Sequence, residues 1–316
     1  IRAIESPSSF NSRTYSILAI RMKENKKILG HVVGIITVLC WGGTFINTKY
    51  LIMGGLAPHE IFLLRFLIGY LCIWTISPRR LFCDNWKDEA LMVLIGMTGG
   101  SLFFQAENMA VALTYTTNVS FIGSTAPLIT TCLAIAFVKS VKADFRLILG
   151  SLIALAGVGV VIFNGQFVLH LNPLGDLLAL LSALAWGIYS LLMKRASARY
   201  SAVFITRKVF FYGIITILPL FAVEPWHFPL DNFLKPTIWL NLLFLGFIAS
   251  FVCFALWGWV IREIGAMKAS NYIYLNPVTT VIASAIFLNE PMTLMAYIGS
   301  ALILLGVYVA NQAKGI

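Results

Sequence analysis

The stretch HVVGIITVLCWGGTFINTKYLI, residues 31–52, carries a single full charge, Lys49. As an α-helix it would be about 30 Å long, which matches the hydrocarbon thickness of a bilayer. The sequence therefore predicts a transmembrane helix here. Comparable apolar runs recur along the chain. They lie at about 59–77, 90–112, 117–138, 147–164, 174–193, 202–222, 236–261, 269–288 and 293–311.

The composition excludes a soluble globular domain. Apolar residues make up 59% of the 316 residues and charged residues only 11%, against roughly 25% charged residues in soluble domains. A soluble fold of this size cannot hide so much apolar surface, and a disordered chain would be far more polar. The five cysteines form no CxxC or similar spacing, so we predict neither a disulfide framework nor a metal site.

Basic residues predict the orientation of the chain. Of the 23 Lys and Arg residues, eighteen fall in the two tails and in alternate connections, and only Lys235 falls in the other connections. Because Lys and Arg are retained on the cytoplasmic side, we predict that both termini are cytoplasmic and that the number of spans is even. The net charge of +10 follows from this bias, and we exclude nucleic acid as a partner.

Landmarks recur at an offset of about 150 residues, which indicates an internal repeat. Since each half holds five apolar runs, the second half would enter the membrane from the opposite face, as in many secondary transporters. The sequence predicts an all-α polytopic membrane protein with ten transmembrane helices in two inverted five-helix repeats. Chance similarity between apolar helices is the alternative. The matched pairs are Trp41-Gly42 with Trp186-Gly187, Gly96 with Gly246, Pro127 with Pro277, and SLIALAG (151–157) with SALILLG (300–306).

The segment LNEPMTLMAYIGSALILLGVYVAN (288–311) resembles the closing segment of EamA-type members of the drug/metabolite transporter superfamily. In that pattern an acidic residue precedes a short loop and a glycine-centred helix, here Glu290, Gly299 and Gly306. The first-half counterpart (138–158) has no acidic residue at the matching position. The resemblance covers residues 28–312. It implies ten helices in two inverted repeats around a central cavity, and export of amino acids or related metabolites.

Three segments are predicted. Residues 1–28 form a cytoplasmic tail, 29–165 the first EamA-like repeat and 174–312 the second. Met22 opens a short basic start, MKENKKILG, so we interpret residues 1–21 as an upstream extension that is partly non-native. A native flexible tail is the alternative, and neither interpretation adds a folded element.

Two prolines are predicted to lie within spans. A proline in a helix clashes with the carbonyl four residues earlier and leaves it without a hydrogen bond. These carbonyls belong to Gly123 for Pro127 and to Ile273 for Pro277. In lipid, such free backbone is tolerated only inside protein or beside a wet cavity. Polar side chains accompany both prolines, which predicts a substrate site near the midplane. A packing kink is the alternative.

Ionisable side chains inside spans are costly and commonly functional. We predict that Glu107 and Arg65 lie in the outer third of the membrane. Glu107 would carry a coupling proton, or the two would form a structural ion pair. Lys49 is expected to snorkel to the interface. Trp41 and Trp186 lie deeper than the span ends and are predicted to contact substrate by stacking or cation–π interaction, with plain packing as the alternative.

The candidate substrate path joins these residues to their polar neighbours. Glu107 lies about 200° around its helix from Gln105, so the two cannot both face the cavity centre. The path comprises Trp41, Thr44, Asn47, Gln105, Asn108, Ser120, Ser124, Pro127, Trp186, Tyr189, Asn271, Tyr274, Asn276 and Pro277, with Glu107 and Arg65 as the coupling or ion-pair residues.

The sequence holds no Walker A loop, no HExxH and no GxSxG, so we predict no catalytic residue and no cofactor. We predict a secondary active transporter that exports small polar metabolites, foremost amino acids or related compounds, across the cytoplasmic membrane by alternating access. Its partners would be a small-molecule substrate and the lipid bilayer, with the chain as a monomer or homodimer. The alternatives are a carrier of phosphorylated or nucleotide-linked sugars, which would need a cationic cluster, and, more remotely, an intramembrane enzyme.

Overall fold

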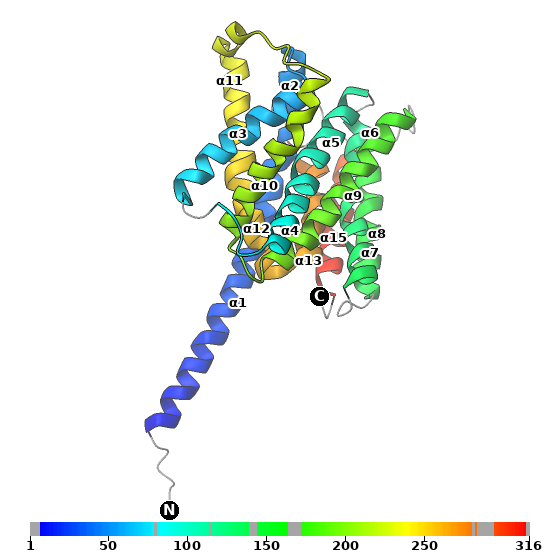
Figure 1. The fold of residues 1–316 in the computed structure, drawn as a ribbon. Coiled ribbons are helices and arrows are strands. Elements are labelled where there is room, and N and C mark those ends of the chain that lie inside the picture. Colours follow the sequence, from blue (N-terminus) through cyan, green and yellow to red (C-terminus); the bar gives the residue numbers. More distant parts are fainter. Residues whose placement is uncertain are drawn as a thin grey trace, which may run out of the picture.

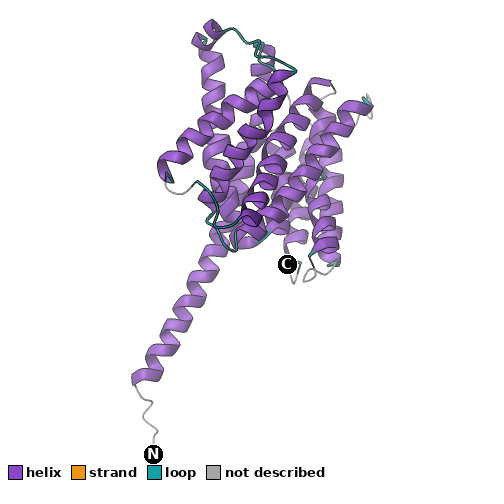
Figure 2. Ribbon diagram, in the orientation of Figure 1, coloured by secondary structure: helices purple, strands orange, loops and turns teal. Residues whose placement is uncertain are grey.

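The computed structural model describes residues 7–78, 81–113, 116–138, 144–163, 172–279, 282 and 294–313. For residues 7–23, 116–118, 120, 161–163 and 296 it describes the backbone alone. These parts of the chain are helical, with short connections and no strand (Figure 2). The prediction of an all-α polytopic membrane protein is confirmed, whereas the count of ten helices and the inverted repeat stay predictions.

Within the described residues, six helical stretches are long and apolar enough to cross a membrane. They are Glu24–Met53, Pro58–Ile76, Trp86–Leu113, Pro173–Ala196, Ala202–Ala222 and Pro236–Ile264. Shorter apolar helices lie at Phe121–Phe137, Phe145–Val160 and Tyr297–Asn311.

The helices form one bundle of long, steeply inclined elements (Figure 1). The first half contains α1 (Pro7–Gly42), α2 (Thr44–Met53), α3 (Pro58–Ile76), α4 (Trp86–Gly96), α5 (Leu102–Leu113), α6 (Thr116–Gly123), α7 (Ala126–Phe137) and α8 (Phe145–Phe163). The second half contains α9 (Pro173–Ala196), α10 (Ala202–Ile217), α11 (Pro236–Leu243), α12 (Cys253–Ile264), α13 (Ala266–Asn271) and α15 (Leu294–Asn311). Shorter 3₁₀ elements are η2 (Leu218–Ala222), η3 (Leu230–Leu234) and η5 (Tyr272–Leu275).

Local sequence sets several of the helix starts. The side chains of Asn85, Asn172 and Ser201 accept hydrogen bonds from backbone N–H groups three residues later, at the beginnings of α4, α9 and α10. Such caps satisfy donors that the first turn leaves free. Prolines begin α3, α9 and α11, where the missing N–H costs nothing.

Helix α1 begins at Pro7 and projects beyond the bundle, at the end where α15 finishes (Figure 1). We expected no folded element in residues 1–21, so the helical extension from Pro7 differs from that expectation. Residues 8–29 contain neither glycine nor proline, and nothing in them interrupts the helix that continues into the bundle.

Three expected spans are discontinuous. The first breaks at Gly43 between α1 and α2, and the fourth breaks between α6 and α7 at residues 124–125. Pro127 therefore lies in the first turn of α7 rather than in mid-helix. In the ninth, α13 passes into the 3₁₀ turn η5 just before Pro277. Both spans that carry a proline thus change from one helical element to another next to it.

Two irregular segments occur at corresponding places in the two halves: the first is kinked at Gly100, where the backbone is non-helical (φ −125°, ψ −106°), and the second is π-helical. Segment η1 (Met97–Ser101) lies between α4 and α5, and η4 (Phe244–Val252) lies between α11 and α12. Both composite helices carry their irregular turn at an offset of about 150 residues. π-helical turns inside α-helices are frequent at functional sites.

Helices α8 and α15 pack with their backbones in near contact. A Cβ atom on Gly150 would lie 2.6 Å from the carbonyl oxygen of Gly306, and one on Gly306 would lie 2.6 Å from that of Gly150. Gly157 meets Gly299 in the same way. Small residues permit this close approach, which favours association of helices in lipid.

Candidate substrate cavity

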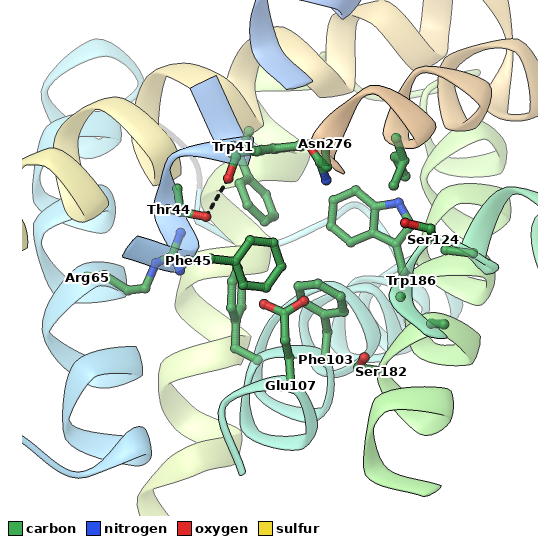
Figure 3. Close-up of a pocket in the computed structure, with 16 residues that line it drawn as sticks. Trp41, Thr44, Phe45, Arg65, Phe103, Glu107, Ser124, Ser182, Trp186 and Asn276 are labelled. Atoms are coloured by element: carbon green, nitrogen blue, oxygen red, sulfur yellow. Dashed lines mark hydrogen bonds between the residues drawn. The ribbon is translucent and has the colours of Figure 1, made fainter. Parts of the chain in front are cut away.

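A cavity opens inside the bundle where the discontinuous helices meet (Figure 3). Its volume is about 80 Å³. Since one water needs only about 10–15 Å³ of such a cavity, it can hold a small polar molecule or several waters. Its walls comprise Trp41, Thr44, Phe45, Arg65, Phe103, Phe104, Glu107, Gly123, Ser124, Ala126, Ser182, Ala183, Trp186, Phe254, Ile273 and Asn276.

All three helix breaks reach this cavity. Thr44 follows the break at Gly43, and its hydroxyl donates to the carbonyl of Trp41 at 2.7 Å. Gly123 and Ile273, whose carbonyls lie four residues before the two prolines, both line the walls. Irregular backbone inside a bilayer is tolerated beside a cavity or within protein, and ligand sites of transporters commonly lie at such breaks.

Six of the sixteen wall residues are aromatic. The Trp41 and Trp186 rings meet edge-to-face with centroids 5.4 Å apart, and the Phe254 centroid lies 5.6 Å from that of Trp41. The Trp41 indole N–H donates to the Ala249 carbonyl at 2.9 Å. The Trp186 N–H has no hydrogen-bond partner among the described residues. These ring faces can hold an apolar side chain or a cation.

Arg65, on α3, brings one positive charge to the cavity. Its side chain is only 3% exposed, and its Nε donates to the Ser250 hydroxyl at 2.9 Å. The guanidinium carbon lies 4.2 Å from the Phe104 ring centroid. Among the described residues, the terminal amino groups of Arg65 have no hydrogen-bond partner.

Glu107, on α5, brings one carboxylate to the same cavity (Figure 3). Neither a hydrogen bond nor an ion pair joins Glu107 to any other described residue. The charged groups of Arg65 and Glu107 do not come within 4.0 Å of each other. In this conformation the two charges therefore face one cavity without forming a closed ion pair.

The structure brings together only part of the candidate path. Of its members, Trp41, Thr44, Ser124, Trp186 and Asn276 line the cavity, as do Arg65 and Glu107. Tyr189 packs on Trp186 with ring centroids 5.1 Å apart. Tyr274, Pro127 and Pro277 are buried beside the breaks without lining the cavity. The Ser120 side chain lies outside the described residues, as does Glu290 of the resemblance motif.

Four amides of the candidate path lie away from the cavity. Asn47 donates to Asn241 at 2.5 Å, Asn108 to the Pro58 carbonyl at 3.3 Å and Asn271 to Asn311 at 3.2 Å. These bonds tie helices together. Gln105 does not line the cavity, as its angular separation from Glu107 predicted.

Several wall residues did not enter the predicted path. Phe103 and Phe104 lie one helical turn before Glu107, and Phe254 lies 150 residues after Phe104. Helical spacing from Glu107 could therefore have predicted Phe103 and Phe104, and the repeat offset could have predicted Phe254. Ser182 offers no such signal, because nothing in its neighbourhood distinguishes it from a serine in a helix contact.

A second polar cluster lies outside the cavity, between α4, α10 and the connection that precedes α4. Lys208 is fully buried on α10 and donates to Glu89 at the start of α4. Tyr212 also donates to Glu89, as does the Cys83 backbone N–H at 2.7 Å. Burial, reinforced by the Glu89 carboxylate, raises the pKa of the Cys83 thiol to about 11, so it is protonated at neutral pH. This cluster contains a structural ion pair that joins the two halves of the chain.

The fold and the cavity define a class, a multi-pass helical membrane protein with a small polar and aromatic cavity at broken helices. Comparison with known proteins gives the family. The chain matches the EamA-like transporter family over residues 28–163 and 173–312, and it belongs to that family. Its members and relatives are named as transporters, not as enzymes.

Individual relatives agree with this assignment. An uncharacterized transporter of Archaeoglobus fulgidus is 28% identical over 90% of this chain and 99% of its own length. A probable terminal-alkyne amino-acid exporter of Streptantibioticus cattleyicolor is 23% identical over 88% of this chain and 92% of its own length. A crystal structure of 19% identity aligns with a TM-score of 0.70, covering 89% of this chain and 96% of that one, and therefore shares the fold.

Proposed function

We propose that this transporter moves small polar metabolites, foremost amino acids or related compounds, by secondary active export across the cytoplasmic membrane. The observation that carries the proposal is the pair of opposite charges, Arg65 and Glu107, that face one cavity without pairing. A buried charge without a partner is costly, and a ligand or water that interacts with it lowers that cost. The relative named as an amino-acid exporter supports the same substrate class.

The cavity provides complementary groups for an amino acid. Arg65 offers a planar set of donors suited to a carboxylate. The ring faces of Trp41 and Trp186 suit an ammonium group through cation–π interaction, and the phenylalanine walls suit an apolar side chain. Glu107 is then available to carry a coupling proton, because a desolvated carboxylate favours its neutral form.

Alternating access would use the two halves as bodies that rock around this cavity. We propose ten transmembrane helices in two inverted repeats, 29–165 and 174–312. The family match in two segments and the corresponding irregular segments η1 and η4 support this arrangement. A carrier of phosphorylated sugars has less support, because Arg65 is the single cation among the described wall residues.

Purified protein in sealed proteoliposomes tests the proposal. Labelled amino acids, including leucine and phenylalanine, are offered for counterflow and then for accumulation with and without an imposed pH gradient. We expect counterflow of at least one amino acid, with accumulation that follows the gradient. Protein-free liposomes are the control. Movement of labelled sugar phosphates with no movement of any amino acid would contradict the proposal.

A further inference from the structure

The position of the Arg65 guanidinium is set by a residue on another helix. Its Nε donates to the Ser250 hydroxyl at 2.9 Å, and both side chains are buried, Ser250 completely. The guanidinium carbon lies over the Phe104 ring. A free arginine side chain samples many rotamers, but the hydrogen bond at Nε and the contact with the ring restrict its orientation.

The π-helical segment η4 brings Ser250 to that place. Ser250 lies within Phe244–Val252, which packs against α3. Four residues earlier, a Cβ atom on Gly246 would lie only 2.6 Å from the Ile68 Cβ atom. The glycine therefore permits close approach between η4 and α3 at the level of Arg65. This contact explains how a serine on one helix reaches an arginine on the other.

The Ser250 bond uses one edge of the guanidinium and leaves the other free. With Nε occupied, the two terminal amino groups remain, and no described residue accepts a hydrogen bond from them. Arg65 lines the cavity, and Figure 3 shows its side chain entering from α3 while Glu107 enters from α5. A guanidinium that presents two parallel N–H donors matches the two oxygens of a carboxylate.

We propose that Ser250 is a positioning residue that fixes Arg65 so that its terminal amino groups select substrates carrying a carboxylate. Arg65 is then the specificity-determining residue, and Ser250 acts through it. This inference rests on the proposed function and adds the chemical group by which substrates are chosen. Loss of the Ser250 hydroxyl would leave the Arg65 charge in the cavity wall but would no longer hold the guanidinium in its orientation.

Two matched pairs of compounds test the inference in the same proteoliposomes. Leucine is compared with leucinol and phenylalanine with phenylalaninol, because each alcohol keeps the ammonium group and the side chain and lacks the carboxylate. The readout is the ratio of half-saturating concentrations, alcohol over acid, measured by inhibition of labelled amino-acid counterflow. We expect a ratio of about ten or more for the natural protein. Hydrogen bonds to a charged group contribute enough binding free energy for a tenfold difference in affinity.

The variants separate selection from stability. Arg65→Gln should bring the ratio close to one. Ser250→Ala should lower it at least about threefold, through weaker binding of the acid with unchanged binding of the alcohol. Ser250→Thr keeps the hydroxyl and should retain the ratio of the natural protein. Ser190→Ala removes another fully buried serine hydroxyl, away from the cavity wall, and should leave the ratio unchanged. A purely structural role for Ser250 would weaken binding of acid and alcohol alike.

Each outcome has a distinct meaning. If the natural protein moves no amino acid, the proposed function fails. If it moves amino acids but binds acid and alcohol equally, transport stands and the selection by Arg65 is overturned. If the natural ratio is high and folded Ser250→Ala keeps it, the positioning role alone is overturned. Should Ser250→Ala fail to fold, Ser250→Cys, which keeps the volume but is a weak acceptor, gives the same comparison.

Discussion

Single side chains decide the chemistry of the cavity, and the substitution of Glu107 tests this most directly. Glu107→Gln keeps the shape of the side chain but cannot gain or lose a proton. We expect it to retain counterflow and to lose accumulation driven by a pH gradient, because Glu107 faces the cavity without an ion-pair partner in the part of the chain that the structure describes. The measurement compares both activities in proteoliposomes for variant and natural protein.

A structural ion pair with Arg65 makes the opposite prediction. In that case Glu107→Gln and Arg65→Gln would each reduce the amount of folded protein, and the double variant would recover part of it. A well-folded Glu107→Gln protein with the natural pH dependence would refute the coupling role.

The Glu89–Lys208 pair is expected to act on stability instead. Glu89→Gln leaves the fully buried Lys208 ammonium without its carboxylate, and an unpaired buried charge is strongly destabilising, by about 3–5 kcal/mol in soluble proteins. The melting temperature in detergent should fall by several degrees, and Lys208→Met should restore part of it in the double variant. Glu24→Gln, at an exposed position, is the control. Equal melting temperatures for Glu89→Gln and Glu24→Gln would show that the pair contributes nothing.

At the scale of elements, the helix breaks are predicted to serve transport. Alanine continues a helix readily and supplies the N–H that proline lacks. Pro127→Ala would let α6 continue into α7. Pro277→Ala would let the helix that follows η5 continue back into this 3₁₀ turn. Both should leave membrane insertion intact and reduce transport, as measured by protease protection and counterflow. Natural transport rates in both variants would reduce the prolines to packing features.

The contact between α8 and α15 gives a second prediction at this scale. Gly306→Leu would place a large side chain where even a Cβ atom lies 2.6 Å from the Gly150 carbonyl oxygen. The helices must then separate, so we expect loss of monodisperse protein in size-exclusion chromatography. Leu149→Ala removes a side chain that is 39% exposed beside this contact and should be tolerated. A monodisperse Gly306→Leu protein would contradict the close packing.

The topology predicted for the whole molecule rests on the positions of its basic residues. A reporter fused after residue 168 should be active outside, and one fused after residue 197 inside. Activity of a phosphatase reporter in the first fusion and of a cytoplasmic fluorescent reporter in the second would agree with five spans before residue 168. The same side for both would contradict the arrangement of five helices followed by five.

The sequence by itself determined the class of this molecule. Bilayer-length apolar runs such as 31–52 leave few structural solutions, because lipid offers no partners for backbone N–H and C=O groups. The sequence also identified Trp41, Trp186, Arg65 and Glu107 as candidate site residues. Charged side chains inside an apolar span are costly and are commonly functional.

Only the tertiary structure decided which polar residues share the cavity. Asn47, Asn108 and Asn271 have the same chemistry as the polar wall residues, but each donates a hydrogen bond to a residue of another helix and does not line the cavity. The Arg65–Ser250 bond joins residues 185 positions apart. Its formation depends on the π segment η4 and on close packing at Gly246. Such contacts arise from packing between distant elements, which hydropathy and spacing along one helix do not encode.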